Sequence, residues 1–215
     1  MVEAYLAGGP ATPAVPRYAA TVMLVRPAPR RRGSEVFMLR RAAAMAFAAG
    51  AMVFPGGRVD DSDSDAVTGW AGPSPQQWAQ RMDCPVDTAR AVVTAAVREL
   101  FEETGVLLAG SGPGSVVRDL DGPQWAEDRV RLAGHELSMG ELAARRGLVL
   151  RTDLLGLRSH WLTPEFEPRR YDTYFFAAAV PEGQNPASCT TEASEELWAR
   201  PHQLFVEAAV GRVML

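Results

Sequence analysis

Residues 98–106 read RELFEETGV and carry Glu99, Glu102 and Glu103 within five positions. On an α-helix, side chains spaced i, i+3 and i+4 share one face, while Leu100 points away from it toward a core. Neighbouring like charges destabilise a helix by about 0.2–0.5 kcal/mol per pair. Carboxylates near a helix C-terminus also oppose the helix dipole. The three carboxylates are therefore expected to destabilise the helix. A bound cation would turn this unfavourable electrostatic contribution into a favourable one.

Three carboxylates on one helix face suit a hard divalent cation. Oxygen-only ligands favour Mg²⁺ or Mn²⁺ over softer metals. Such an ion keeps several waters and coordinates substrate phosphates, which indicates phosphoryl transfer chemistry. The alternative is an acidic helix face that is simply solvated, which is the usual meaning of such a triplet taken alone. The sequence thus leaves two interpretations of Glu99, Glu102 and Glu103: a metal site or a solvated surface.

The apolar pattern predicts that these glutamates end a long helix. Small and apolar side chains recur at three- and four-residue steps from Thr88 onward. Asp87 is expected to be the N-cap, and Gly105 is expected to stop the helix. A helix of about 17 residues would be roughly 25 Å long.

Residues 60–86 interrupt the chain between a glycine turn and this helix. Pro55-Gly56-Gly57 predicts a tight turn with close backbone approach. The segment that follows is polar and rich in Pro and Gly, and it is expected to form an inserted excursion with one short helix after Ser74.

Three aspartates at the start of this segment have the spacing of calcium-loop ligands: Asp61, Asp63 and Asp65. Ala66 stands where a calcium loop needs glycine, and Gly72 stands where it needs a bidentate glutamate. A solvated turn is therefore the preferred interpretation.

Strands are expected on both sides of the central helix. The runs 18–26 and 35–40 predict an antiparallel pair, and further extended runs cover 154–162, 171–180 and 196–200. Weaker helical stretches cover 124–133 and 139–146, and Pro201 can open a terminal helix. This pattern predicts an α+β fold with helices packed on a mixed sheet.

Composition and charge exclude several classes of protein. The chain has 215 residues with 47% apolar residues, enough for one domain with a real core. Its net charge of −4 gives no general attraction to nucleic acid or anionic lipid. All 22 basic residues are arginine, which excludes P-loop and Schiff-base lysine chemistry. Cys84 and Cys189 lie far apart without metal-ligand spacing, which indicates a reducing compartment and no zinc site.

No export or membrane segment is expected. Residues 1–16 lack the basic start and apolar run of a signal peptide and are expected to form a flexible arm, leaving 17–215 as a single domain. The uncharged stretch 42–57 is too short and too broken by glycine to span a bilayer. The cytoplasm is the expected location.

The segment RELFEETGV resembles the second half of the Nudix box, REUxEExGU, in which U is a bulky aliphatic residue. Gly57 resembles the glycine that opens the box, but it precedes Arg98 by 41 positions instead of fourteen, so about 27 residues are inserted. Arg90 stands where the box has a glutamate, eight positions before the arginine. This interrupted box, with MLRRAAAMAFAAGAMVFPGG before it and HWLTPEFEPRRYDTYFF after it, resembles the peroxisomal coenzyme A diphosphatases and their bacterial relatives.

The resemblance covers residues 17–215 and implies a Nudix-type α/β/α sandwich with the carboxylate helix packed on a mixed sheet. It implies metal-dependent hydrolysis of a small-molecule nucleotide, most specifically coenzyme A or acyl-coenzyme A. ADP-ribose, dinucleotides or oxidised nucleotides are the alternative substrates, and a non-catalytic ligand sensor is a further alternative. Many members of the family form dimers, so the resemblance implies a homodimer as the candidate oligomeric state.

The resemblance also implies roles for single residues. Glu99, Glu102 and Glu103 would hold Mg²⁺ or Mn²⁺, and Arg98 would orient a ligand carboxylate. Glu195 is the candidate general base, with a solvated acidic loop as the alternative. Phosphates favour arginine partners, although each such arginine also fits an ordinary surface position. The candidate substrate-binding residues are Arg40, Arg41, Gly56, Gly57, Arg169 and Arg170.

Overall fold

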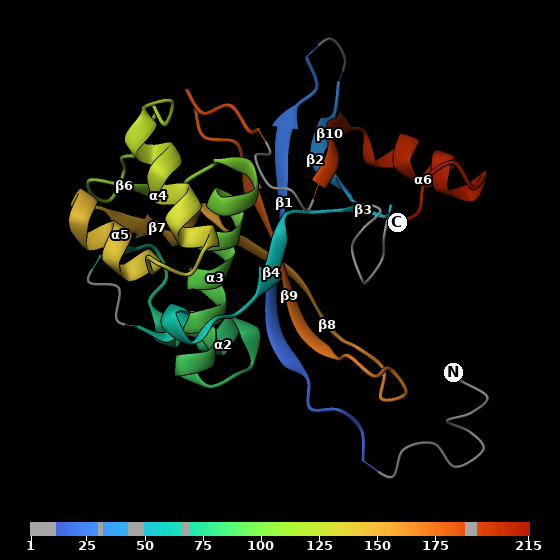
Figure 1. The fold of residues 1–215 in the computed structure, drawn as a ribbon, viewed down its shortest axis with the longest axis horizontal. Helices are drawn as coiled ribbons and strands as arrows, with labels where there is room; N and C mark the ends of the chain where they lie inside the picture. Colours follow the sequence, from blue (N-terminus) through green and yellow to red (C-terminus); the bar gives the residue numbers. More distant parts are fainter. Residues whose placement is uncertain (1–11, 30–31, 43–49, 66–68, 188–192) are drawn as a thin grey trace.

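A computed structural model describes residues 12–29, 32–42, 50–65, 69–187 and 193–215. Figure 1 shows a layer of helices on one side of a twisted sheet, with a single helix near the C-terminus on the other side. The predicted α+β architecture is confirmed. Cys189 and Ala66 lie outside the described residues, and so does most of the expected N-terminal arm.

The main sheet has the strand order β10-β2-β1-β9-β8, with β3 on β2 and β4 on β1. β1 and β9 are parallel, and the other pairs of this sheet are antiparallel. Its strands are β1 (Arg17–Pro27), β2 (Ser34–Arg41), β3 (Met52–Val53), β4 (Gly56–Arg58), β8 (Gly156–Leu162), β9 (Tyr171–Ala179) and β10 (Ala193–Ala199). The predicted antiparallel pair of β1 and β2 is confirmed.

A small second sheet and the remaining helices complete the fold. β7 (Val149–Arg151) lies between β5 (Trp70–Ala71) and β6 (Ala109–Gly110). The helices are η1 (Asp61–Ser64), α2 (Pro75–Met82), α3 (Val86–Thr104), α4 (Pro123–Ala133), α5 (Met139–Arg146), η2 (Thr152–Leu154) and α6 (Pro201–Ala209). None of the helices in the described ranges is long and apolar enough to cross a membrane.

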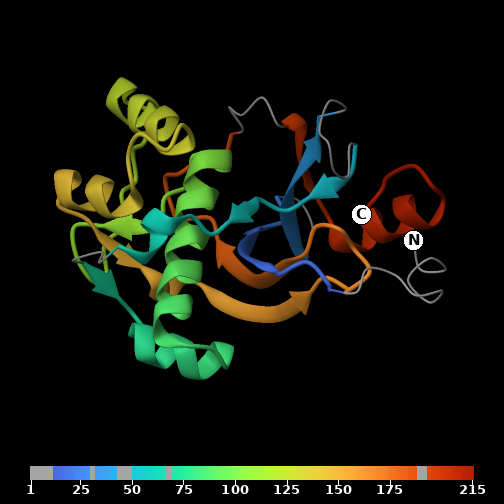
Figure 2. The same ribbon diagram turned by 60° about the horizontal axis from the view of Figure 1, so that its bottom comes forward.

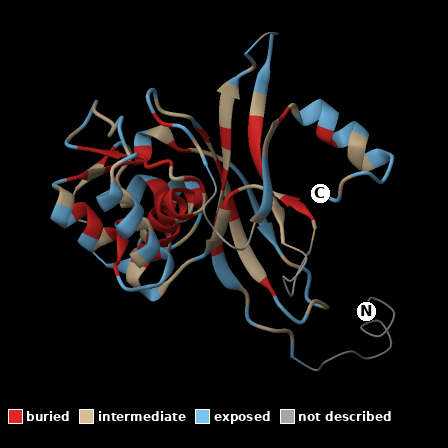
Figure 3. Cartoon of the chain, turned by 45° about the horizontal axis from the view of Figure 1, so that its top comes forward, coloured by how far each residue is buried: buried red, intermediate tan, exposed pale blue. Residues whose placement is uncertain are grey.

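The core lies between α3 and one face of the sheet, as Figures 2 and 3 show. Alternate residues of β1, such as Val22 and Leu24, are fully buried against α3 residues such as Val93 and Val97. On the opposite face, Leu204 of α6 packs against Met38 of β2 in a smaller cluster. Helices on both faces of a mixed sheet form the α/β/α sandwich that was expected.

The long helix begins two residues before the predicted start. Pro85 occupies the N-cap and Asp87 lies in the first turn, so the prediction of Asp87 as the cap is wrong. Proline suits a helix start because its fixed φ is already helical and it has no N–H to leave unpaired. The predicted stop is confirmed, because Gly105 is left-handed with φ 72°.

The described residues of the segment 60–86 form the predicted short helix and also contribute to the core. Ser74 caps α2 as predicted. Trp78 of α2 is completely buried and meets Phe176 of β9 edge to face, with 5.8 Å between ring centroids. Trp70 and Ala71 pair with β7, so the segment also supplies a strand of the second sheet. The fold therefore depends on the inserted residues.

Replacing Trp78 with alanine tests this dependence. We expect Trp78→Ala to lower the free energy of unfolding by about 3–5 kcal/mol, because a buried aromatic side chain is removed and a cavity is left. Trp161→Ala is the matched control, since 70% of Trp161 is exposed on β8 and its loss should change stability by less than about 0.5 kcal/mol. Denaturant unfolding measures both, and equal values for the two variants would contradict a core role for α2.

Candidate active site

Helix α3 brings the predicted glutamates to the edge of the core. Glu102 is buried, and Glu99 and Glu103 are half-buried, although all three are charged residue types. Leu100 points to the opposite side and is fully buried, as its place in the helical pattern predicts. The glutamates thus lie on one helix face, beneath the strand β4.

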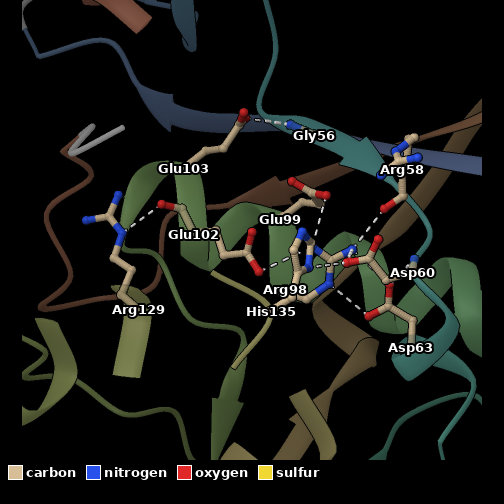
Figure 4. Close-up of polar contacts among 10 residues, drawn as sticks. All are labelled: Gly56, Arg58, Asp60, Asp63, Arg98, Glu99, Glu102, Glu103, Arg129 and His135. Atoms are coloured by element: carbon tan, nitrogen blue, oxygen red, sulfur yellow. Dashed lines mark hydrogen bonds and ion pairs between the residues drawn. The ribbon is translucent and has the colours of Figure 1, made fainter. Parts of the chain in front are cut away.

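Arg98 is the centre of a buried network of charges (Figure 4). Only 3% of its side chain is exposed. Its Nε and Nη2 donate to the two carboxylate oxygens of Asp63 at 2.9 and 2.8 Å, in a bidentate pair. Its Nη1 donates to Glu99 Oε1 at 3.0 Å and to Glu102 Oε1 at 3.2 Å. One guanidinium therefore fixes carboxylates from two separate elements.

Two further groups close this network. The Arg98 Nη2 atom also donates to the carbonyl oxygen of Arg58 at 2.8 Å and lies 3.7 Å from Asp60 Oδ2. His135 Nδ1, from the turn after α4, lies 2.9 Å from the same Asp60 oxygen. The guanidinium thus has partners on every nitrogen, which is the condition for burying a charge at acceptable cost.

The partner that the sequence analysis missed is Asp63. The Nudix box places its glutamate eight positions before the arginine and its glycine fourteen positions before it, so glutamate follows glycine by six. Asp63 follows Gly57 by six positions. The interpretation that Arg90 replaces the supporting acid is therefore wrong, because Asp63 supplies it. The same spacing places the extra residues after position 63 rather than from position 60. The expectation of a solvated turn fits the exposed Asp61 and Asp65, but it is wrong for Asp63, which is fully buried against Arg98.

The glycine turn lies directly on the glutamates. A Cβ atom on Gly57 would be 2.3 Å from Glu99 Oε1, so no larger residue fits there without moving that carboxylate. The N–H of Gly56 donates to Glu103 Oε2 at 2.8 Å. The close approach that the Gly56-Gly57 pair predicted is confirmed, and it joins β4 to the carboxylate helix.

The site carries more negative charge than its own cation offsets. Burial, with the added repulsion of Glu102 and Glu103, raises the pKa of Glu99 to about 8, although Arg98 opposes the shift. Burial also raises the pKa of Glu102. Burial lowers the pKa of Arg98, but its bond to Asp63 and the neighbouring glutamates outweigh that effect and raise it. A further cation near these carboxylates would relieve the repulsion.

The donor set fits a hard divalent cation. The potential metal ligands are carboxylate oxygens, which hard cations prefer. The hydrogen bonds described above involve one oxygen each of Glu99, Glu102 and Glu103. In the described part of the chain, no three acidic, histidine or cysteine side chains converge as they do in a preformed metal site. The fit therefore rests on charge excess and ligand chemistry.

Arg129 of α4 secures the C-terminal end of α3. Its Nε donates to the carbonyl oxygen of Glu102 at 2.8 Å, and its Nη2 donates to the carbonyl oxygen of Ala187 at 2.9 Å. The N–H of Ala187 in turn donates to the carbonyl oxygen of Thr104 at 2.8 Å. The turn that carries Glu102 is thus tied to the segment between β9 and β10. No motif in the sequence pointed to Arg129.

The other predicted site residues lie elsewhere. Glu195 of β10 accepts a hydrogen bond of 2.7 Å from Arg40 Nε of β2. The two residues lie directly opposite each other in the antiparallel pair at the edge of the sheet. Arg170 is buried and donates to the carbonyl oxygens of Thr163 and Ala14.

Arg41 ends β2, and Arg169 is exposed in the turn before β9. The structure thus brings together Arg98, the three glutamates and the glycine pair. Glu195, Arg40, Arg41, Arg169 and Arg170 do not join that cluster, and their assigned roles stay predictions.

Comparisons with known proteins agree with this geometry. No model of a known protein family matches the chain. A protein of Caenorhabditis elegans called "Putative nudix hydrolase 7" is 31% identical over 199 residues, which are 93% of this chain and 56% of that protein. The chicken (Gallus gallus) "Acyl-coenzyme A diphosphatase NUDT19" is 28% identical, and the match covers 88% of this chain and 66% of that protein. The chain therefore spans between half and two thirds of the length of these relatives.

A solved structure shares most of the fold. The crystal structure of a NUDIX hydrolase from Alicyclobacillus acidocaldarius superposes with a TM-score of 0.77 at 26% identity. The match covers 92% of this chain and 85% of that one. The likeness thus extends over most of this chain.

The buried pair of Arg98 and Asp63 can be tested by substitution. We expect Asp63→Asn to lower the free energy of unfolding by about 3–5 kcal/mol, because it leaves a buried guanidinium without its charged partner. Asp65→Asn is the control, since Asp65 is exposed at the end of η1. Chemical denaturation monitored by circular dichroism measures both, and an unchanged Asp63→Asn protein would show that the pair does not hold the site.

Proposed function

The chain belongs to the Nudix hydrolase superfamily, and we propose that it is a divalent-metal-dependent enzyme that hydrolyses a diphosphate linkage in a nucleotide derivative. The observation that carries the proposal is the carboxylate face of α3, held in place by the buried pair of Arg98 and Asp63. A helix optimised for stability alone would not gather three carboxylates at its C-terminal end.

Glu99, Glu102 and Glu103 would hold Mg²⁺ or Mn²⁺. When bound, such an ion neutralises diphosphate oxygens and activates water. The chain's own part is orientation: Arg98 fixes the rotamers of Glu99 and Glu102, and the N–H of Gly56 fixes Glu103. Fixed ligands reduce the reorganisation needed at the moment of reaction.

Coenzyme A or acyl-coenzyme A is the substrate that we propose. The name of the chicken relative supports this class, and so does the insertion between Gly57 and Arg98. ADP-ribose, dinucleotides and oxidised nucleotides remain the alternative substrates of the same chemistry. A sensor without catalysis is a weaker alternative, because Arg98 and all three glutamates are present.

Further roles belong to the same proposal. Glu195 is the proposed general base, and a rearrangement would have to release it from Arg40. Arg40, Arg41, Arg169 and Arg170 are the proposed phosphate ligands, and Arg40 and Arg170 would have to exchange their present bonds to Glu195 and to Thr163. A cytoplasmic location and a homodimer complete the proposal.

Neutralising one metal ligand tests catalysis. We expect Glu103→Gln to lower kcat by at least about a hundredfold, because a charge that acts on the transition state is lost. The amide oxygen of glutamine can still accept from Gly56, so the fold should be unchanged. Glu127→Gln, on the exposed side of α4, is the matched control. Turnover at saturating Mn²⁺ equal to that of the wild type would remove Glu103 from the site.

A substrate panel tests the class of nucleotide. At fixed Mg²⁺ we expect kcat/KM for coenzyme A to exceed the values for ADP-ribose and for a diadenosine polyphosphate. Product analysis should show phosphopantetheine released from coenzyme A. Brisk cleavage of ADP-ribose without release of phosphopantetheine would reverse the ranking of the two substrate classes.

A further inference from the structure

The C-terminal end of α3, which carries Glu102 and Glu103, is held by hydrogen bonds from outside the helix. The last four carbonyl groups of an α-helix have no partner within it. In α3 the carbonyl oxygen of Thr104 accepts from the N–H of Ala187 at 2.8 Å. The carbonyl oxygen of Glu102 accepts from Arg129 Nε at 2.8 Å (Figure 4). The position of this turn therefore depends on two other parts of the chain.

Arg129 of α4 also joins these two parts to each other. Its Nη2 donates to the carbonyl oxygen of Ala187 at 2.9 Å, so one guanidinium links the helix end to the residue that bonds Thr104. The three hydrogen bonds form a closed ring through α3, α4 and the segment after β9. A guanidinium presents its donors in a rigid planar fork, whereas the ammonium of lysine is a compact point charge on a flexible stem. The ring therefore depends on the shape of the arginine side chain as well as on its charge.

The segment after β9 has attachments that do not involve Arg129. The side chain of Gln184 is buried, and its Oε1 accepts from the N–H of Leu107 at 2.9 Å. Its Nε2 donates to the carbonyl oxygen of Leu107 at 3.0 Å. Arg118 Nη2 forms an exposed ion pair with Glu182 Oε2 at 2.9 Å. Without Arg129 the segment should stay attached, so the loss would fall on the last turn of α3.

We propose that Arg129 is a positioning residue for the carboxylate site, which fixes the last turn of α3 and with it the side chains of Glu102 and Glu103. The inference rests on the proposed function, in which these two residues hold the metal ion. Outer partners of metal ligands typically account for about ten- to a hundredfold of the metal affinity. A role through charge alone predicts the opposite effect, because a cation near a metal site repels the metal ion.

Titration calorimetry with Mn²⁺ and no substrate tests the proposal. We expect Arg129→Gln to bind Mn²⁺ about tenfold more weakly than the wild type, because the last turn of α3 loses its fixed position. Arg129→Lys should also bind more weakly, since a single nitrogen replaces the two that hold the carbonyl groups. Arg118→Gln removes an exposed arginine bonded to the same segment, so it is the matched control and should bind as the wild type does. Circular dichroism checks that each variant is folded.

Two results would overturn the proposal. One is tighter Mn²⁺ binding by Arg129→Gln with wild-type binding by Arg129→Lys, which would show a role through charge alone. The other is equal Mn²⁺ affinity of Arg129→Gln and Arg118→Gln. Kinetics at saturating Mn²⁺ add a second readout: in Arg129→Gln, kcat should fall while KM for the nucleotide stays within about twofold. A raised KM with unchanged kcat would place Arg129 on the substrate and would also contradict the proposal.

Glu102→Gln separates this inference from the proposed function. If Mn²⁺ binds the wild type but not Glu102→Gln, the metal site stands, and the comparison of Arg129→Gln with Arg118→Gln decides the inference alone. If Glu102→Gln binds Mn²⁺ as tightly as the wild type does, Glu102 is not a ligand and both proposals fail.

Discussion

The structure depends on one guanidinium that is almost completely buried among carboxylates. Arg98 holds Asp63 in a bidentate pair and reaches both Glu99 and Glu102, so a single charge fixes η1 and the candidate metal ligands together. A buried cation is stable only with such a full set of partners. The carboxylates that remain in excess define the chemistry, because their repulsion favours a dication and hence phosphate substrates.

The helical periodicity was enough to predict α3, its stop at Gly105 and the face shared by the glutamates, because these are local properties of the chain. The strand pair β1 and β2 was predictable for the same reason. The partner of Arg98 does not follow from its distance to the arginine in the sequence, because the insertion lies between the two residues. Its spacing from Gly57, six positions, is the one that the box requires, so this signal for Asp63 is present in the sequence.

The assignment of arginines shows where sequence reasoning ends. Arg40 and Arg41 were predicted to bind phosphate because they end a strand just before the glycine turn. Whether such a residue meets a ligand or a carboxylate depends on strand order and register, which join β2 to β10 across about 150 residues of chain and place Glu195 beside Arg40. Neither strand order nor register can be read from local patterns.

The place of the insertion explains how an interrupted motif keeps its geometry. The extra residues follow Asp63, so the spacing between the glycine turn and the supporting acid is unchanged. The bond between Asp63 and Arg98 then holds both against α3, although the insertion separates them from the helix in the sequence. Lengthening a loop costs only about 0.6 kcal/mol for each doubling of its length. Burial of Trp78 in the core offsets more than that cost, since a fully buried aromatic side chain contributes about 1.5–3 kcal/mol. The insertion can therefore vary in content while Asp63 and Arg98 stay in contact, provided that α2 keeps its anchor in the core.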